Sequence, residues 1–459
     1  MNYNKMSRIE LRATWGLSAV FFLRMLGMCM VLPILTVYGI QIPKASETLI
    51  GLAIGIYGAT QAIFQIPFGL LSDRFGRKPL IVIGLLLFTA GSLVATITES
   101  IWGIILGRAL QGSGAISSVI MALLSDLTCE QNYTKAITFI GMGFGITFSI
   151  AIIIGPIIAN ILNIHELFSI TALLSVIAII ITVIIVPSSS IQILNRDVVT
   201  VRSGIKTIIT NKHLIKLNLS IFFLHVLLMS NFISLPTQFS LAGFPSKDHW
   251  KIYLCTIFIS FVTTIPSVLY AEINKQMKSF VISCTVLMLG SEILLWNSDH
   301  IFYKLFIGLQ IFFISFNIME AILPSLINKE CPVGYKGTAM GLYSTSQFLG
   351  VAIGGSVNGW LLDHFGVNHV FLFGSLLSLA WLLLTMNMRE PPYLSSLRLT
   401  LSSPFIDTIK LEQSLRTHKG VFDVLLLPKE KNIYIKIDKK ITSRSSIEEI
   451  ISDHTIPQE

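Results

Sequence analysis

Long apolar stretches alternate with short polar ones along most of this chain. A run of about twenty apolar residues is long enough to cross the hydrocarbon core of a bilayer as a helix. Such runs lie near 13–38, 48–72, 79–97, 101–127, 135–161, 165–187, 215–240, 250–271, 279–296, 301–327, 336–361 and 367–388. The pattern predicts an all-α membrane protein with twelve transmembrane helices.

One polar segment inside this region, residues 188–214, is much longer than the others and divides the runs six and six. We therefore expect two six-helix bundles, residues 1–187 and 215–390, joined by a cytoplasmic linker. Short motifs also recur between the halves, such as Met121 to Leu127 in the fourth run and Met319 to Leu326 in the tenth. Parallel halves of this kind place a substrate site between them, near the middle of the membrane.

The last part of the chain, residues 393–459, has a different pattern. Alternating apolar residues predict strands at 397–401, 422–427 and 433–437, and helical spacing predicts a helix at 407–418 and another after Ser445. The order β-α-β-β-α is typical of a ferredoxin-like α+β domain. This domain has no cysteine for a soft metal, and Tyr434 alone does not supply the aromatic platform of an RNA-binding sheet. It is interpreted as a cytoplasmic regulatory or interaction domain, with an unknown ligand or partner.

Composition agrees with a chain that lies mostly in lipid. Apolar residues make up 53% of the chain and charged residues 13%, against about 25% charged in a soluble domain. A net charge of +8 could indicate nucleic acid, but the cations lie in loops between apolar runs, so we expect no nucleic-acid partner. The five cysteines have no paired spacing. We expect no metal site, no cofactor and no enzymatic activity.

The side on which the loops lie follows from their cations. Loops after even-numbered runs, with the residues that flank them, hold Arg74, Arg77, Lys78, Lys135, Arg196, Arg202, Lys206, Lys212, Lys275, Lys278, Lys329 and Lys336. The opposite loops hold little beyond Lys44, Lys247 and Lys251. Cytoplasmic loops carry the excess of lysine and arginine. The sequence therefore predicts a multi-pass protein of the bacterial inner membrane, with both termini in the cytoplasm.

The loop between the second and third runs is dense in charge and glycine. It follows the pattern G-x-L-x-D-R-x-G-R-K, with the key positions Gly69, Asp73, Arg74, Gly76, Arg77 and Lys78. By this loop and its membrane setting, the chain resembles the major facilitator superfamily. The resemblance implies secondary transport of a small molecule by alternating access, in which two helical bundles rock about a central cavity.

The same loop suggests a conformational latch. Asp73 ends the second run on the side where the eleventh run begins, near Lys336, and a helix N-terminus carries unpaired N–H groups and partial positive charge. Asp73 is expected to face that helix when the cytoplasmic side is closed, and Arg77 to pair with Asp126 at the end of the fourth run. The alternative is that these charges only determine topology.

Two further motifs resemble family elements. Arg108, Gln111, Gly112 and Gly114 fit the pattern R-x-x-Q-G-x-G, and an arginine inside the membrane requires a partner or a water-filled cavity. Arg108 is interpreted as a proton-coupling residue or, alternatively, as a hydrogen-bond tether. Gly155-Pro156 predicts a helix kink and resembles part of a drug–proton antiporter motif. Both trailing glycines of that motif are missing, which leaves antiport open.

Other polar residues inside the apolar runs complete the list of candidate site residues. Those proposed for proton coupling, with Glu320 ranked above Asp126, are Arg108, Glu320, Asp126 and Arg24. Those proposed to line a substrate cavity are Gln61, Gln65, Gln111, His225, Asn231 and Asn317. Glu320 ranks first because Arg24 stands where the resemblance implies a carboxylate in the first run, although a pair between Arg24 and Glu320 is an equal alternative.

These features favour a proton-coupled exporter of small compounds that is embedded in the lipid bilayer. One alternative is a facilitator or symporter that takes up a nutrient. Another is a transporter-like sensor that is regulated through its cytoplasmic domain. The sequence does not identify the substrate.

Overall fold

The computed structural model describes residues 6–128, 130–188, 206–332, 335–390, 395–400, 408–427, 432–437, 441–442 and 444–453. Most of the predicted linker, residues 189–205, lies outside this part of the chain. Residues 428–431, between the predicted strands at 422–427 and 433–437, lie outside it as well.

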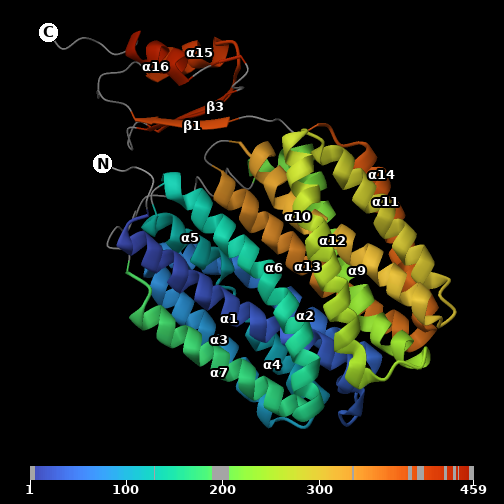
Figure 1. Ribbon diagram of the computed structural model, residues 1–459. Coiled ribbons are helices and arrows are strands. Elements are labelled where there is room, and N and C mark those ends of the chain that lie inside the picture. The colour runs from blue at the N-terminus through green and yellow to red at the C-terminus, as the bar shows by residue number, and fades with distance from the viewer. Residues whose placement is uncertain are drawn as a thin grey trace.

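Long helices form the body of the molecule (Figure 1). The N-terminal half contains α1 (Arg8–Tyr38), α2 (Glu47–Phe75), α3 (Arg77–Ile97), α4 (Ile101–Ser113), α5 (Ser117–Leu127), α6 (Glu130–Ile161) and α7 (Ile164–Ile184). The C-terminal half contains α9 (Lys212–Leu241), α10 (His249–Ile273), α11 (Met277–Trp296), α12 (Phe302–Glu330), α13 (Lys336–Phe365) and α14 (Val367–Met386). Short 3₁₀ turns follow α1 and α9.

Most of these helices have the length and the apolar composition of membrane-spanning helices. Within the described residues, ten segments are long and apolar enough to cross one by length and composition, with α4 and α5 counted as a single segment. Helices α6 and α13, with 32 and 30 residues, also have the length of a span and lie among the others (Figure 1). Large apolar side chains such as Ile97, Ile184 and Phe258 are exposed on the outside, as lipid-facing residues must be.

The fourth predicted span is broken in the middle, where a continuous helix over 101–127 was expected. Helix α4 ends at Ser113 and α5 begins at Ser117. A Cβ on Gly114 would collide with the backbone carbonyl of Gly84 on α3, so the chain passes very close to α3 at the break. Broken helices at membrane depth occur where the freed backbone groups have other partners, and Arg24 is such a partner here.

The C-terminal domain has the predicted element order: β1 (Ser395–Thr400), α15 (Thr408–Thr417), β2 (Val421–Leu427), β3 (Asn432–Ile437) and α16 (Arg444–Asp453). The sheet order is β1-β3-β2, and β3 pairs antiparallel with both neighbours. Leu411, Leu415 and Ile447 of the helices are fully buried with the inward-facing residues of the sheet. This is the ferredoxin-like arrangement that the sequence predicts.

The C-terminal domain lies beyond one end of the helical body, which we call the domain end; the opposite end is the far end (Figure 1). Lys436 on β3 contacts the last turn of α12 there. Its ammonium group donates to the backbone carbonyl of Lys329 at 2.8 Å and to that of Cys331. Lys436 is only 6% exposed. A cation at a helix C-terminus is favourable because it satisfies carbonyl groups that lack helical partners.

Candidate functional site

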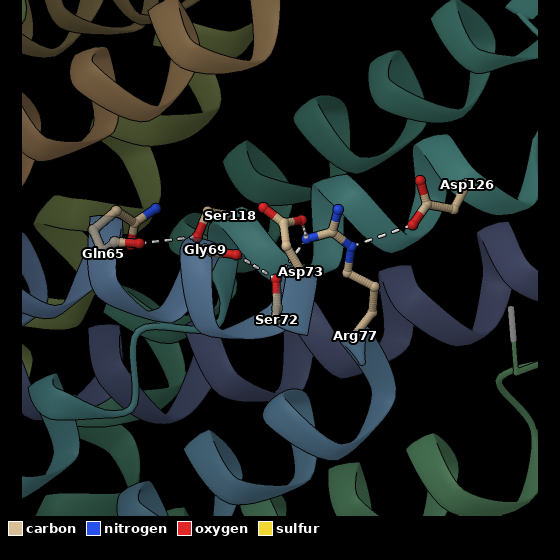
Figure 2. A network of polar contacts seen from close by, with 7 residues as sticks. All are labelled: Gln65, Gly69, Ser72, Asp73, Arg77, Ser118 and Asp126. Carbon is tan, nitrogen blue, oxygen red and sulfur yellow. Dashed lines mark hydrogen bonds and ion pairs between the residues drawn. The ribbon is translucent and has the colours of Figure 1, made fainter. Parts of the chain in front are cut away.

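Three charged residues of the N-terminal half meet at the domain end (Figure 2). Gly76 turns the chain between α2 and α3 with φ of 93°, a conformation that favours glycine. Arg77, at the start of α3, then contacts Asp73 at 2.5 Å and Asp126 at 3.2 Å. The predicted pair between Arg77 and Asp126 is present. It joins the start of α3 to the end of α5.

Neutral groups extend this cluster along α2. Arg77 also donates to the Ser72 hydroxyl at 2.6 Å, and Ser72 donates to the carbonyl of Gly69 at 2.7 Å (Figure 2). Lys78 donates to two carbonyls at the end of α7, Val183 at 2.9 Å and Val186 at 2.8 Å. The loop therefore connects four helices of the N-terminal half. Its remaining cation, Arg74, is exposed.

Helices α2 and α13 pack directly against each other at the far end through small residues, which we call the glycine seam. A Cβ on Gly51 would lie 2.7 Å from the Gly359 Cα, and a Cβ on Gly55 would lie 2.6 Å from the Ala352 carbonyl oxygen. Gly58 and Gly355 are equally close to backbone of the opposite helix. Because any side chain here would separate the helices, the glycines hold the two halves together at the far end.

The same faces of these helices are apart at the domain end. The α2 positions continue at helical spacing from Gly58 to Gly69 and Asp73. On α13, a Cβ added to Gly337 or Gly341 would meet no atom within 4 Å. Asp73 keeps 34% of its side chain exposed, and its contact is to Arg77. Among the residues that the structure describes, the predicted contact of Asp73 with the start of α13 is therefore not made in this conformation.

A contact of the predicted kind is present at the far end, with the roles of the two helices exchanged: the acid is on α13 and the helix N-terminus belongs to α2. Asp363 in the last turn of α13 accepts a hydrogen bond from the Thr48 hydroxyl at 2.6 Å, in the first turn of α2. The backbone N–H of Thr48 also donates to this carboxylate. An acid of one half thus lies at the helix N-terminus of the other half, which is the arrangement that the sequence predicts for Asp73 and α13.

Arg24 lies near the middle of α1 and is 1% exposed. Its guanidinium donates to the side-chain carbonyl of Gln61 on α2 at 2.7 Å and to the backbone carbonyl of Gly114 at 2.7 Å. Ser117 at the start of α5 accepts a third bond at 3.3 Å. Arg24 therefore supports the break in the fourth span. Its partners are neutral groups of its own half, so the suggested pair with Glu320 is not formed.

Arg108 is also buried within the N-terminal half, at 1% exposure. Its charge stacks over the ring of Tyr57, 4.4 Å from the centroid, and it donates to Gln111 at 3.0 Å. Gln111 in turn donates to Ser92 on α3 at 2.8 Å. These contacts are those of a tether between α2, α3 and α4, while its proton-coupling role stays a prediction.

The C-terminal half brings three polar residues together near the middle of its helices. The Gln347 amide on α13 donates to the Glu320 carboxyl on α12 at 3.2 Å and to His225 Nε2 on α9 at 2.9 Å. His225 Nδ1 donates to the Ile221 carbonyl at 3.1 Å. The second carboxyl oxygen of Glu320 is buried and has no hydrogen-bond partner in the described part of the chain. Asn317, one turn before Glu320, is half-buried.

The other predicted cavity residues lie inside the bundles. Gln61 and Gln65 are 0% and 2% exposed and hydrogen-bond to each other at 3.2 Å. Asn231 is 2% exposed and donates to Glu292 on α11 at 2.8 Å. Their role in a substrate cavity stays a prediction.

Gly155 and Pro156 lie within α6, which continues to Ile161, so the predicted kink stays a prediction. A Cβ on Gly155 would lie 3.0 Å from the Met30 carbonyl, which shows that α6 and α1 approach closely at this point. Sequence reasoning missed Gln347 and Asp363. A glutamine in the middle of an apolar run was the available signal for Gln347.

A family model described as Major Facilitator Superfamily matches residues 17–355 and 256–405, and one described as YajR YAM domain matches residues 397–453. The inner membrane transport protein YajR of Escherichia coli (strain K12) is 54% identical over 451 residues, covering 98% of this chain and 99% of the relative. An uncharacterized transporter of Buchnera aphidicola subsp. Schizaphis graminum (strain Sg) is 44% identical over 381 residues, 83% and 97% of the two chains.

Among solved structures, the nucleoside transporter NupG matches with a TM-score of 0.66 and 16% identity, covering 82% of this chain and 98% of its own. At this identity the likeness concerns the fold alone. It agrees with two helical halves arranged as the sequence predicts.

Proposed function

This chain belongs to the Major Facilitator Superfamily, and we propose that it exports small compounds across the bacterial inner membrane in exchange for protons. The domain end, with both termini, faces the cytoplasm in this proposal, since its loops carry the excess of cations. The conformation described above is then the one in which the two halves are parted on the cytoplasmic side.

The observation that carries proton coupling is the Glu320 carboxyl group. It lies at membrane depth, and within the described residues its one hydrogen-bond partner is the neutral amide of Gln347. Its second oxygen is buried and unpartnered. A carboxylate without a cation is unfavourable there, which favours the protonated acid in this state. Rearrangement around α12 and α13 would give Glu320 different surroundings, so it can take up a proton in one state and release it in the other.

Alternating access is supported by the glycine seam. The seam is packed at the far end, and its continuation on the same helix faces is open at the domain end. Rocking the halves would open the first contact and close the second. Asp73 would then reach the start of α13, as Asp363 reaches the start of α2 here. Each end would have its own acid-to-helix latch.

Transport into inverted membrane vesicles tests the function. We expect vesicles that contain the protein to accumulate a substrate when their interior is acidic, and to lose it when the pH gradient is collapsed. Candidate substrates come from ligand-dependent thermal shifts of the purified chain across a library of small compounds. Accumulation that is indifferent to the gradient would exclude proton exchange, and faster uptake by whole cells than by a deletion strain would favour an importer.

The two latches give a paired prediction. Asp73→Asn should weaken closure of the cytoplasmic side by about 1–2 kcal/mol, the size of a charge–dipole contact in partly buried geometry. That changes the ratio of the two states by roughly 5- to 30-fold. The measurement is the rate at which a maleimide labels Gly337→Cys in a variant that lacks the native cysteines. Asp73→Asn should raise this rate.

Asp363→Asn is the matched control, because it removes the same charge from the other latch. It should lower the labelling rate of Gly337→Cys by favouring the state that is open at the far end. Equal rates in the parent and in both variants would show that neither acid biases the conformation.

A further inference from the structure

A basic depression lies at the domain end of the C-terminal half. It is located where α9 and α11 begin and where α12 and α14 end. The residues that line it are His213, Leu217, Lys278, Leu326, Glu330, Met388 and Arg389. None of them takes part in the latches or in the Glu320 cluster, so the function proposed above does not use this site.

Its rim carries more positive than negative charge. Lys278 is half-buried, and its ammonium group has no hydrogen-bond or ion-pair partner among the described residues. Arg389 keeps 60% of its side chain exposed and donates to Glu330 at 3.3 Å. Glu330 is the one acid in the lining, and its side chain is 6% exposed. His213 adds a third nitrogen-bearing group on the same rim.

The depression is apolar on its inner side, and a helix that ends beside it carries exposed apolar residues. Leu217 and Leu326 form its buried floor, at 1% and 2% exposure. Helix α14, which ends beside it, exposes a row of apolar residues at helical spacing that leads away toward the far end: Leu376, Leu379, Leu383 and Met386. A ligand with an anionic head and a long apolar chain fits this combination.

We propose that this depression binds the head group of an anionic phospholipid. Lys278 and Arg389 would donate to the phosphodiester oxygens, as basic pockets between transmembrane helices do at the cytoplasmic side. One acyl chain would then lie along the exposed row of α14. The row favours a lipid over free phosphate. Both ligands offer the same phosphate oxygens, but only the lipid has an acyl chain that gains binding free energy by burying apolar surface.

Native mass spectrometry of the full chain in an uncharged detergent tests the proposal. Phosphatidylglycerol is titrated against phosphatidylcholine with the same acyl chains, and inorganic phosphate is added as a competitor in a third series. We expect phosphatidylglycerol to bind more tightly than phosphatidylcholine, and millimolar phosphate to leave it bound. Equal binding of the two lipids, or displacement by phosphate, would overturn the proposal of an anionic lipid.

Substitutions locate the site. Lys278→Gln should weaken phosphatidylglycerol binding by about 10- to 150-fold, the effect of one hydrogen bond to a charged group. Lys278→Arg should restore it to within about twofold, since it keeps the charge and the donors. Lys251→Gln is the matched control, because Lys251 is an exposed cation at the far end, paired with Asp248 at 2.6 Å. Unchanged binding in Lys278→Gln, or an equal loss in Lys251→Gln, would contradict the site.

Discussion

Glu320→Gln is expected to reduce pH-driven accumulation in inverted vesicles to the level measured after the gradient is collapsed. The glutamine keeps the size of the side chain and can still accept from Gln347, but it cannot bind or release a proton at neutral pH. Exchange of labelled for unlabelled substrate without a gradient should continue. Loss of accumulation with exchange retained indicates lost proton coupling, whereas loss of both indicates a misfolded protein.

Glu292→Gln is the control for this prediction. Glu292 is another acid of the same half. Unlike the half-buried Glu320, it is 0% exposed, and it lies inside the bundle against Asn231 and beside Gly374 on α14. Its substitution should leave proton-driven accumulation unchanged. If Glu292→Gln loses coupling while Glu320→Gln keeps it, the proton site has been assigned to the wrong carboxyl group.

Gly55→Ala is expected to block closure of the far end. The new methyl group would lie 2.6 Å from the Ala352 carbonyl oxygen, so α2 and α13 would have to separate. Overpacking of a tight contact costs about 1–3 kcal/mol. The state described here would lose population relative to the opposite one by roughly 5- to 150-fold. Disulfide cross-linking between Thr48→Cys and Asp363→Cys measures this closure and should become much slower.

Gly290→Ala provides the comparison, since a Cβ at this position on α11 meets no atom within 4 Å. Replacing glycine by alanine stabilises a helix by roughly 0.8–1.0 kcal/mol at either site. If cross-linking slows in Gly55→Ala but not in Gly290→Ala, a weakened helix is therefore not the cause. Cross-linking at the parental rate in Gly55→Ala would mean that the glycine seam does not set the far-end contact.

The fold could be predicted from the sequence because lipid imposes a simple rule on it. Each span must be a helix of sufficient length, and apolar runs between polar loops therefore reveal the helices directly. The break at Gly114 could not be predicted in this way. It depends on a close approach to Gly84 of α3 and on the guanidinium of Arg24, and both come from other parts of the chain.

The pair of Arg77 with Asp126 could be predicted because the ends of neighbouring helices meet on the same side. The pair of Asp73 with Arg77 was not predicted, since the sequence directs Asp73 to the start of α13. A polar residue within a span requires a hydrogen-bond partner, but the sequence does not show whether its side chain points to a neighbouring helix or into a cavity. For this reason the sequence does not predict the hydrogen bond of Asn231 to Glu292 inside the bundle, and the cavity role of Asn231 stays a prediction.

The Lys436 contact ties the C-terminal domain to α12, and thus to the C-terminal half. If the two halves rock as proposed, the C-terminal domain moves with the C-terminal half. A fluorophore pair, one on the exposed Phe422 position of β2 and one on the exposed end of α2 at Phe75, would therefore change its distance once per transport cycle. The small domain would serve as a built-in reporter, through which single molecules could be timed as they turn over.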